Sequence, residues 1–255
     1  MEPPVFNEAN MRKTEEQPPM LRVEGLSKRF GGLKAVDDVS FEVTRGSIAA
    51  LIGPNGAGKS TTFNLLTGFT RADAGTVTFD GEEITGSAPH VLARRGLVRT
   101  FQTARPFPSM TVKEIVATAA MLRLGRREAM TAAAGVLDRL SIGGLADKRA
   151  SALSLPDRQM VELAKCVAMK PRMVLLDEIM GGLNRAEAQA PVAAIRELSE
   201  LEGITFLLVE HVMPIVMTLT SHIVVLDFGR LIAAGTPAVI SADPAVQRSY
   251  LGSAA

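Results

Sequence analysis

Residues 53–61 read Gly-Pro-Asn-Gly-Ala-Gly-Lys-Ser-Thr, and this stretch decides the fold. It fits the pattern of a phosphate-binding loop, in which spaced glycines precede a lysine and a hydroxyl residue. An apolar run predicts a strand over Ile48–Ile52 before the loop, and residues 61–66 after it predict a helix. A strand, a glycine-rich loop and a helix in this order predict a site for a phosphate group, which a surface turn carrying one lysine would not explain.

The residues of this loop have distinct chemical roles in such a site. Glycines let backbone N–H groups surround a phosphate, and the N-terminus of the following helix adds a partial positive charge. Lys59 can reach the β- and γ-phosphates of a nucleotide, and the Ser60 hydroxyl can bind Mg²⁺. The loop residues predicted to bind the nucleotide are Asn55, Gly56, Gly58, Lys59, Ser60 and Thr61.

The composition excludes several other classes of protein. The chain has 255 residues, 47% of them apolar, and 28 basic against 27 acidic residues give a net charge of +1. This balance offers no broad positive field for nucleic acid, so we expect no nucleic-acid partner. We interpret the basic cluster at Arg94, Arg95 and Arg99 as a solvated helix face. The single cysteine, Cys166, lies in an apolar helical run and predicts a buried thiol.

The pattern along the chain predicts an α/β fold. Residues 1–20 are polar and rich in proline, so we expect a disordered leader. Apolar strand-like runs alternate with helical runs on both sides of a purely helical block, and this alternation predicts a mostly parallel sheet. The helical block covers about residues 105–155 and is read as a subdomain inserted into one domain of residues 21–255. No run reaches the ~20 apolar residues of a membrane helix, so we expect no direct membrane insertion.

Polar side chains follow two further predicted strands. The strand at 173–176 is followed by Asp177 and Glu178, and the strand at 204–209 is followed closely by His211. Ligands of open α/β sheets bind at the carboxyl ends of the strands. Asp177 is therefore predicted to hold Mg²⁺, Glu178 to polarise the water that attacks the γ-phosphate, and His211 to orient that water. The alternatives are a carboxylate pair at a helix N-terminus and a structural histidine.

In order and spacing, these motifs resemble the ATPase subunits of ABC transporters over about residues 21–253. Residues 26–32 resemble the adenine-stacking loop of that family, with Phe30 as the aromatic platform. Residues 96–102 resemble the Q-loop of the branched-chain amino acid importer subclass, and Gln102 would contact Mg²⁺ and the attacking water. The ending over residues 227–237, with the late Tyr-Leu-Gly, resembles the same subclass.

The resemblance implies a fold, a mechanism and partners. The fold is a P-loop NTPase core sheet with an antiparallel β subdomain and an inserted α-helical subdomain. Two ATPase subunits, identical or different, would close head to tail around two ATP molecules, each held by one phosphate-binding loop and by Ser154 in the signature motif of the partner. Closure would drive transmembrane permease subunits, and the chain would lie peripherally on the cytoplasmic face of the inner membrane. The importer would take branched-chain or related amino acids.

The signature segment departs from the family pattern, which is close to Leu-Ser-Gly-Gly-Gln. This chain has Leu-Ser-Leu-Pro-Asp over residues 153–157. Ser154 is kept, but Leu155 adds bulk and Pro156 has no N–H to offer a phosphate. Ser154 at the N-cap and Asp157 three residues later still predict a good helix start. We expect the fold to be kept while the composite ATP site is weakened.

Three other functions remain open at this point. A lipopolysaccharide exporter ATPase would have a similar sequence. A switch subunit that binds ATP and closes, yet hydrolyses it weakly, would suit the altered signature segment. A P-loop kinase for small molecules is disfavoured, because Phe30, Gln102, Ser154 and His211 occur in the order of the ABC family.

Overall fold

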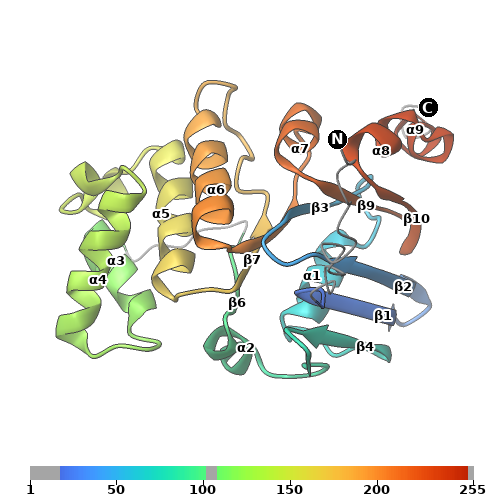
Figure 1. Cartoon of the computed structure of the whole chain (residues 1–255), viewed down its shortest axis with the longest axis horizontal. Helices are drawn as coiled ribbons and strands as arrows, with labels where there is room; N and C mark the ends of the chain where they lie inside the picture. The colour runs from blue at the N-terminus through green and yellow to red at the C-terminus, as the bar shows by residue number, and fades with distance from the viewer. Residues whose placement is uncertain (1–17, 102–107, 252–255) are drawn as a thin grey trace, which may run out of the picture.

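The computed structural model describes residues 18–101 and 108–251, and these residues form two sheets with helices packed around them (Figure 1). The larger sheet has the strand order β10-β9-β3-β8-β7-β6. Its strands are parallel, except that β10 is antiparallel to β9. Their bounds are β3 Ile48–Ile52, β6 Leu97–Arg99, β7 Met173–Asp177, β8 Thr205–Val209, β9 His222–Asp227 and β10 Arg230–Gly235. This topology confirms the predicted mostly parallel sheet.

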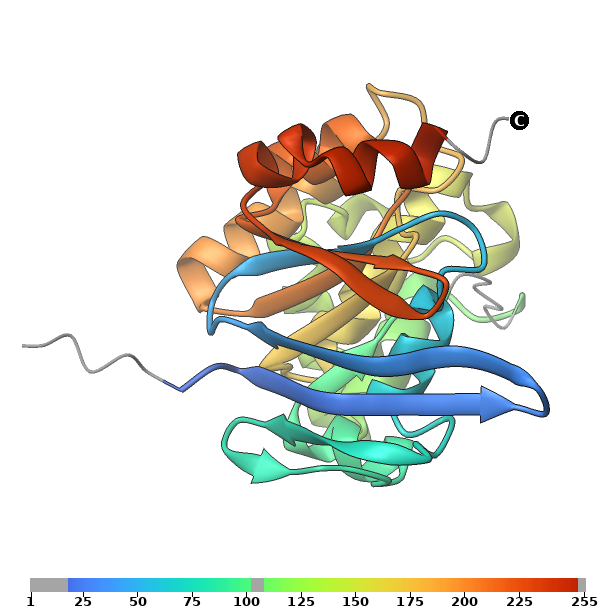
Figure 2. The ribbon, with the colours of Figure 1, turned by 90° about the vertical axis from the view of Figure 1, so that its right-hand side faces the viewer.

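The smaller sheet is antiparallel, with the order β2-β1-β4-β5. Its strands are β1 Leu21–Phe30, β2 Leu33–Val43, β4 Ala74–Phe79 and β5 Glu82–Glu83. Figure 2 shows β1 and β2 as long neighbouring ribbons below the larger sheet. Gly31 turns the chain between them with φ 57°, a conformation that a residue without a Cβ adopts without strain.

The helices α1, α3, α4 and α5 lie where the sequence predicts a helix after the phosphate-binding loop, a helical block and a helix start. Helix α1 follows the phosphate-binding loop, α2 precedes β6, and α3 and α4 lie together at one end of the molecule beside α5 (Figure 1). The bounds are α1 Lys59–Leu66, α2 Pro89–Arg95, α3 Val112–Ala120, α4 Arg126–Arg139, α5 Leu155–Ala168, α6 Gln189–Glu202, α7 Met213–Leu219, α8 Pro237–Ala242 and α9 Pro244–Leu251. Short 3-10 turns at Gly143–Leu145 and Ala150–Ala152 join α4 to α5.

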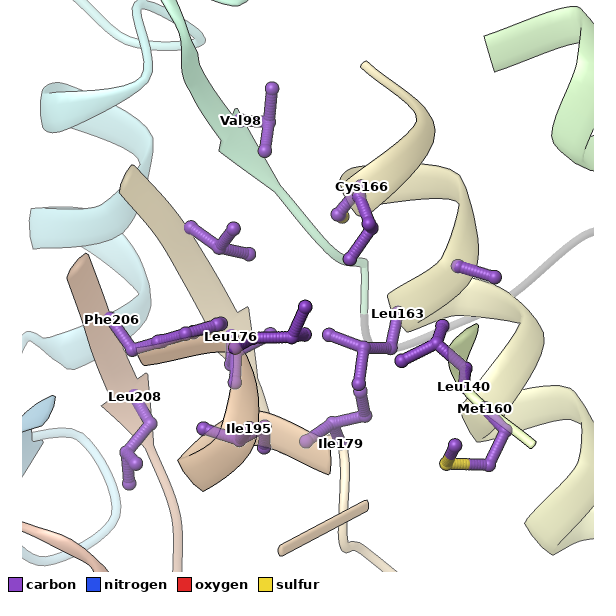
Figure 3. Close-up of a cluster of buried hydrophobic side chains, with 14 of the residues drawn as sticks. Val98, Leu140, Met160, Leu163, Cys166, Leu176, Ile179, Ile195, Phe206 and Leu208 are labelled. Atoms are coloured by element: carbon purple, nitrogen blue, oxygen red, sulfur yellow. The ribbon is translucent and has the colours of Figure 1, made fainter. Parts of the chain in front are cut away.

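Alternate residues of the central strands enter two different cores. In β3, Ile48, Ala50 and Ile52 face the core that is built with α3 to α7, while Ala49 and Leu51 face the core between the two sheets. Figure 3 shows Leu163 and Leu176 pointing toward one another in the first of these cores, with Phe206 and Leu208 on the strand side and Met160 on the helix side. A strand buried on both faces must be apolar throughout, which is why the parallel strands read as continuous apolar runs.

The structure contains ordered elements that the sequence did not predict, some of them near the two ends of the described residues. Met20 is buried and its N–H donates to the Val43 carbonyl, so the ordered core begins just inside the predicted leader. Helices α8 and α9 and the short strand β5 were not predicted. Among the helices of residues 18–101 and 108–251, none combines the length and apolar character that a bilayer span requires.

Candidate functional site

The phosphate-binding loop leaves the fully buried strand β3 and turns into α1 at Lys59. Two glycines are fixed there by their surroundings. A Cβ at Gly53 would lie 2.1 Å from the Leu226 carbonyl oxygen, and one at Gly58 would lie 2.4 Å from the Ala35 carbonyl oxygen. Both residues also have positive φ, 150° and 100°. Only glycine fits these positions, so the loop is held in one shape by the neighbouring strands.

Lys59 lies inside this loop. Its side chain is buried, and its Nζ donates to the carbonyl oxygens of Gly53 at 2.8 Å and Pro54 at 2.9 Å. Burial lowers the pKa of Lys59, while the negative charges of Glu178 and Asp177 act in the opposite direction. The ammonium is therefore partly desolvated, and its two hydrogen-bond partners are neutral carbonyl oxygens that an anionic ligand can replace.

The loop opens into a cleft of about 420 Å³. The predicted residues that line it are Phe30, Asn55, Gly56, Gly58, Lys59, Ser60, Thr61, Glu178 and His211. Phe30 is half exposed at the end of β1, and the Lys28 ammonium lies 5.5 Å from the centre of its ring. The cleft thus joins an aromatic surface to a phosphate-binding loop, as a nucleotide requires. Asp177 and Ser154 do not line the cleft, and Gln102 lies outside the described residues.

Glu178 and His211 meet at the carboxyl ends of β7 and β8. The Glu178 Oε1 and His211 Nε2 atoms are 2.6 Å apart. The Glu178 backbone has φ 52°, which is uncommon for a residue with a side chain and typical of functional sites. Its N–H donates to the Val209 carbonyl at 2.9 Å, which holds the strained residue against β8. A carboxylate hydrogen-bonded to an imidazole can accept a proton from water.

Asp177 is buried and paired with a residue that the sequence interpretation misplaced. Arg99 does not lie on a solvated helix face: it ends β6, its side chain is 9% exposed, and its NH2 nitrogen is 2.7 Å from the Asp177 Oδ2 atom. The interpretation was wrong because Arg94 and Arg95 do end a helix, whereas Arg99 follows two buried strand residues. A charged residue continuing an apolar strand was the available signal.

Glu210 is a second residue whose role the sequence did not reveal. It is 2% exposed, and its Oε1 atom accepts a hydrogen bond of 2.8 Å from the Met180 N–H. Burial raises the pKa of Glu210 to about 7, against opposing hydrogen bonds from the Met180 and His211 backbones. The bond ties the segment after Glu178 to the end of β8. Ile179 and Met180, the next two residues after Glu178, are buried in the core.

The signature segment starts α5 as predicted. The Ser154 Oγ atom caps the helix by accepting from the Asp157 N–H at 3.3 Å, and Pro156 lies in the first turn. Among the amides of residues 155–157, Pro156 therefore offers no donor and the N–H of Asp157 is engaged by the cap. The Leu155 side chain is 43% exposed, and a Cβ added at Gly182 would lie 3.1 Å from its Cδ2 atom.

A larger hollow of about 480 Å³ lies between α6 and α7 and is lined mainly by apolar residues. It contains none of the predicted site residues, so we assign the functional site by its chemistry and not by volume. Val212, one of its lining residues, follows His211 in the chain, just after the carboxyl end of β8.

Comparison with known proteins decides the family. The chain matches the family model described as ABC transporter over residues 36–181. The chain belongs to the ABC transporter family of ATPases. Its ending matches a second model, described as Branched-chain amino acid ATP-binding cassette transporter, over residues 230–255. The phosphate-binding loop and the Asp177–Glu178 pair both lie inside the first match.

Relatives of the ABC family cover almost the whole chain. It is 40% identical over 252 residues to the high-affinity branched-chain amino acid transport ATP-binding protein BraF of Pseudomonas aeruginosa, covering 92% of this chain and 99% of the relative. The corresponding protein LivG of Escherichia coli K12 gives the same identity and coverage. A probable LivG of Methanocaldococcus jannaschii is 35% identical over 260 residues, covering 95% of this chain and 100% of the relative.

Solved ABC cassettes share the fold closely. A nucleotide-free ATP-binding cassette superposes with a TM-score of 0.85 at 33% identity, covering 91% of this chain and 99% of the cassette. The ADP conformation of an ABC transporter cassette gives a TM-score of 0.85 at 34% identity, covering 92% and 99%. These matches confirm the predicted P-loop NTPase fold. They also show that the family to which the chain belongs binds nucleotide.

Proposed function

We propose that this chain binds ATP with Mg²⁺ and hydrolyses it to power an importer of branched-chain or related amino acids. One observation carries the proposal: Lys59, Glu178 and His211 line one cleft, with the carboxylate and the imidazole in contact. The substrate class rests on the match at residues 230–255 and on the names of the relatives. The same evidence favours an importer over a lipopolysaccharide exporter.

The residues of the cleft divide the work of holding ATP. Phe30 offers a ring face for the adenine base at the open end. The loop backbone and the Lys59 ammonium neutralise the phosphates, and Lys59 would exchange its two carbonyl partners for phosphate oxygens. The glycines at 53 and 58 hold the loop open, since neither position has room for a Cβ.

The residues present fit Mg²⁺ when it arrives with a nucleotide. Within residues 18–101 and 108–251, no three His, Cys, Asp or Glu side chains form a cluster that could hold a metal alone. Mg²⁺ with ATP does not need such a cage, because phosphates and water fill most of its positions. Ser60, Asp177 and the proposed ligand Gln102 would hold it. When bound, Mg²⁺ would neutralise charge that develops on the transferred phosphoryl group.

Glu178 and His211 would act on the attacking water. Glu178 accepts the proton of that water, and the 2.6 Å contact with His211 fixes the direction of the carboxylate. Gln102 and Ser154 are proposed to complete the site, Ser154 across a dimer from the second ATPase subunit. We infer that residues 21–255 form one ATPase domain, in which about residues 105–155 make the subdomain that contacts the permease on the cytoplasmic face of the membrane.

A switch that hydrolyses ATP weakly is the second candidate. Leu155 and Pro156 favour it, because Pro156 removes one N–H donor from the start of α5 and Leu155 adds bulk where a partner's ATP would approach. In a homodimer both sites would carry this defect, whereas a partner with an intact signature segment would leave this chain's own cleft fully active. The number of fast sites per dimer therefore separates a homodimer from a heterodimer.

The test is phosphate release by the purified chain, alone and reconstituted in vesicles with its permease and second ATPase subunit. We expect Mg²⁺-dependent release that rises when leucine and its binding protein are present, and loss of release in Glu178→Gln. Glu200→Gln, a change on the exposed side of α6, is the matched control and should behave as wild type. Release that is unaffected by Glu178→Gln would contradict the proposal.

A further inference from the structure

The buried Arg99 side chain joins α1, whose first residues line the cleft, to the end of β7, which directly precedes the cleft residue Glu178. Its NH1 nitrogen donates to the Asn64 Oδ1 atom at 2.6 Å and to the Thr67 Oγ1 atom at 3.4 Å. Its NH2 nitrogen donates to the Asp177 Oδ2 atom at 2.7 Å. Asn64 lies in α1 and Thr67 caps its end, so one guanidinium bridges α1 and the end of β7.

This bridge links the elements that carry the proposed Mg²⁺ ligands. Ser60 lies one turn before Asn64 in α1, and Asp177 ends β7. In the sheet, β3, which leads into α1, is separated from β7 by β8. The distance between the hydroxyl and the carboxylate is therefore not set by direct strand pairing, and a side-chain link across the gap constrains it.

Aromatic rings hold the guanidinium in place. The Arg99 Cζ atom lies 5.7 Å from the ring centre of Phe63, 5.9 Å from that of Phe69 and 5.3 Å from that of Phe101. Phe63 is fully buried, and the other two rings pack edge to face at 5.5 Å. A lysine in this place could keep the positive charge, but it could neither form the two-armed bridge nor stack on the rings.

We propose that Arg99 is a positioning residue that sets the Asp177 carboxylate against α1 for Mg²⁺ binding. The inference rests on the proposed function of the cleft. It does not require Arg99 to touch the nucleotide, because Arg99 does not line the cleft. Arg99 acts through Asp177, so losing the bridge should weaken the binding of the metal while nucleotide binding by the loop is kept.

The test compares Arg99→Met and Arg99→Lys with Arg95→Met as the matched control. Arg95 is on the neighbouring helix α2, with 40% of its side chain exposed. ADP affinity is measured by calorimetry in EDTA, and Mn²⁺ affinity of the ADP complex by electron paramagnetic resonance. We expect Arg99→Met to keep its ADP affinity in EDTA within about 2-fold and to lose about 10-fold or more in Mn²⁺ affinity. Arg99→Lys should lie between it and wild type.

A double-mutant cycle separates positioning from a general structural role. If Arg99 acts through Asp177, adding Arg99→Met to Asp177→Asn changes Mn²⁺ affinity no further. Additive losses, or unchanged Mn²⁺ affinity in Arg99→Met, would overturn the inference. Should Arg99→Met fail to fold, Arg99→Lys and the double variant, which buries no unpaired carboxylate, give the same answer. Wild-type protein that binds no ADP would refute the proposed function itself.

Discussion

Replacing Glu210 by Gln should change how the stability of the protein depends on pH. The Glu210 carboxyl is buried, and burial raises its pKa from the ordinary value of 4.5 to about 7. Between these two values the folded protein holds a proton that the unfolded chain has released. The free energy of unfolding therefore falls as pH rises through this window, and it loses no more above it. Gln is neutral and keeps an oxygen that can accept from the Met180 N–H.

The size of the effect follows from the two pKa values. The interval from 4.5 to about 7, at about 1.4 kcal/mol for each pH unit, amounts to about 3 kcal/mol. Urea unfolding followed by circular dichroism at pH 4.5, 6, 7 and 8 measures it. The stability of wild type relative to Glu210→Gln should fall by about this amount over the series, mostly before pH 7.

The comparison with Gln isolates Glu210, because both proteins share all other titrating groups. Glu200→Gln on the exposed side of α6 is the control, and its difference from wild type should stay flat with pH. A wild-type stability that does not fall relative to Glu210→Gln, or that rises, would refute the assignment of a buried, protonated carboxyl to this position.

Three further variants test other parts of the account. Gly58→Ala should weaken nucleotide binding at least about 10-fold, because its Cβ would collide with neighbouring main chain at 2.4 Å; affinity by calorimetry checks this. Leu155→Gly combined with Pro156→Gly should raise ATP turnover of the assembled transporter about 10-fold or more, because it removes the bulk of Leu155 and restores one N–H donor at residue 156; unchanged turnover would count against a weakened composite site. Tyr250→Phe should lower the free energy of unfolding by about 1 kcal/mol, because the partly buried Tyr250 hydroxyl interacts with the Gly53 backbone; an unchanged urea midpoint would show that this interaction does not stabilise the fold.

The parts of the fold predicted from sequence are those with a local signal. Strands β3, β7 and β8 are buried on both faces and read as apolar runs, so their positions were predicted within a residue or so. The outer ends of the β1–β2 hairpin carry no strand signal, because they are polar and exposed and strand pairing alone keeps them extended. Helices α8 and α9 are short and begin at prolines, and a short segment that begins at a proline is typical of a loop in a sequence.

The site shows the same division. The loop residues, Glu178 and His211 follow strands directly, and parallel strands bring their ends together. Arg99 and Glu210 each continue an apolar strand, which is a signal of burial, but their partners lie 78 and 30 residues away. The identity of these distant partners is the information that the sequence pattern did not contain, and it concerns residues that support the ligands more than the ligands themselves.

The central claim is that the cleft around Lys59 binds ATP, and calorimetric titration of the purified chain with ATP tests it most directly. Our account predicts saturable binding of one ATP per chain, competition by ADP, and a loss of at least about 10-fold in affinity in Lys59→Met, which removes the ammonium. Absence of binding by the folded wild-type chain, or equal affinity in Lys59→Met, would contradict it.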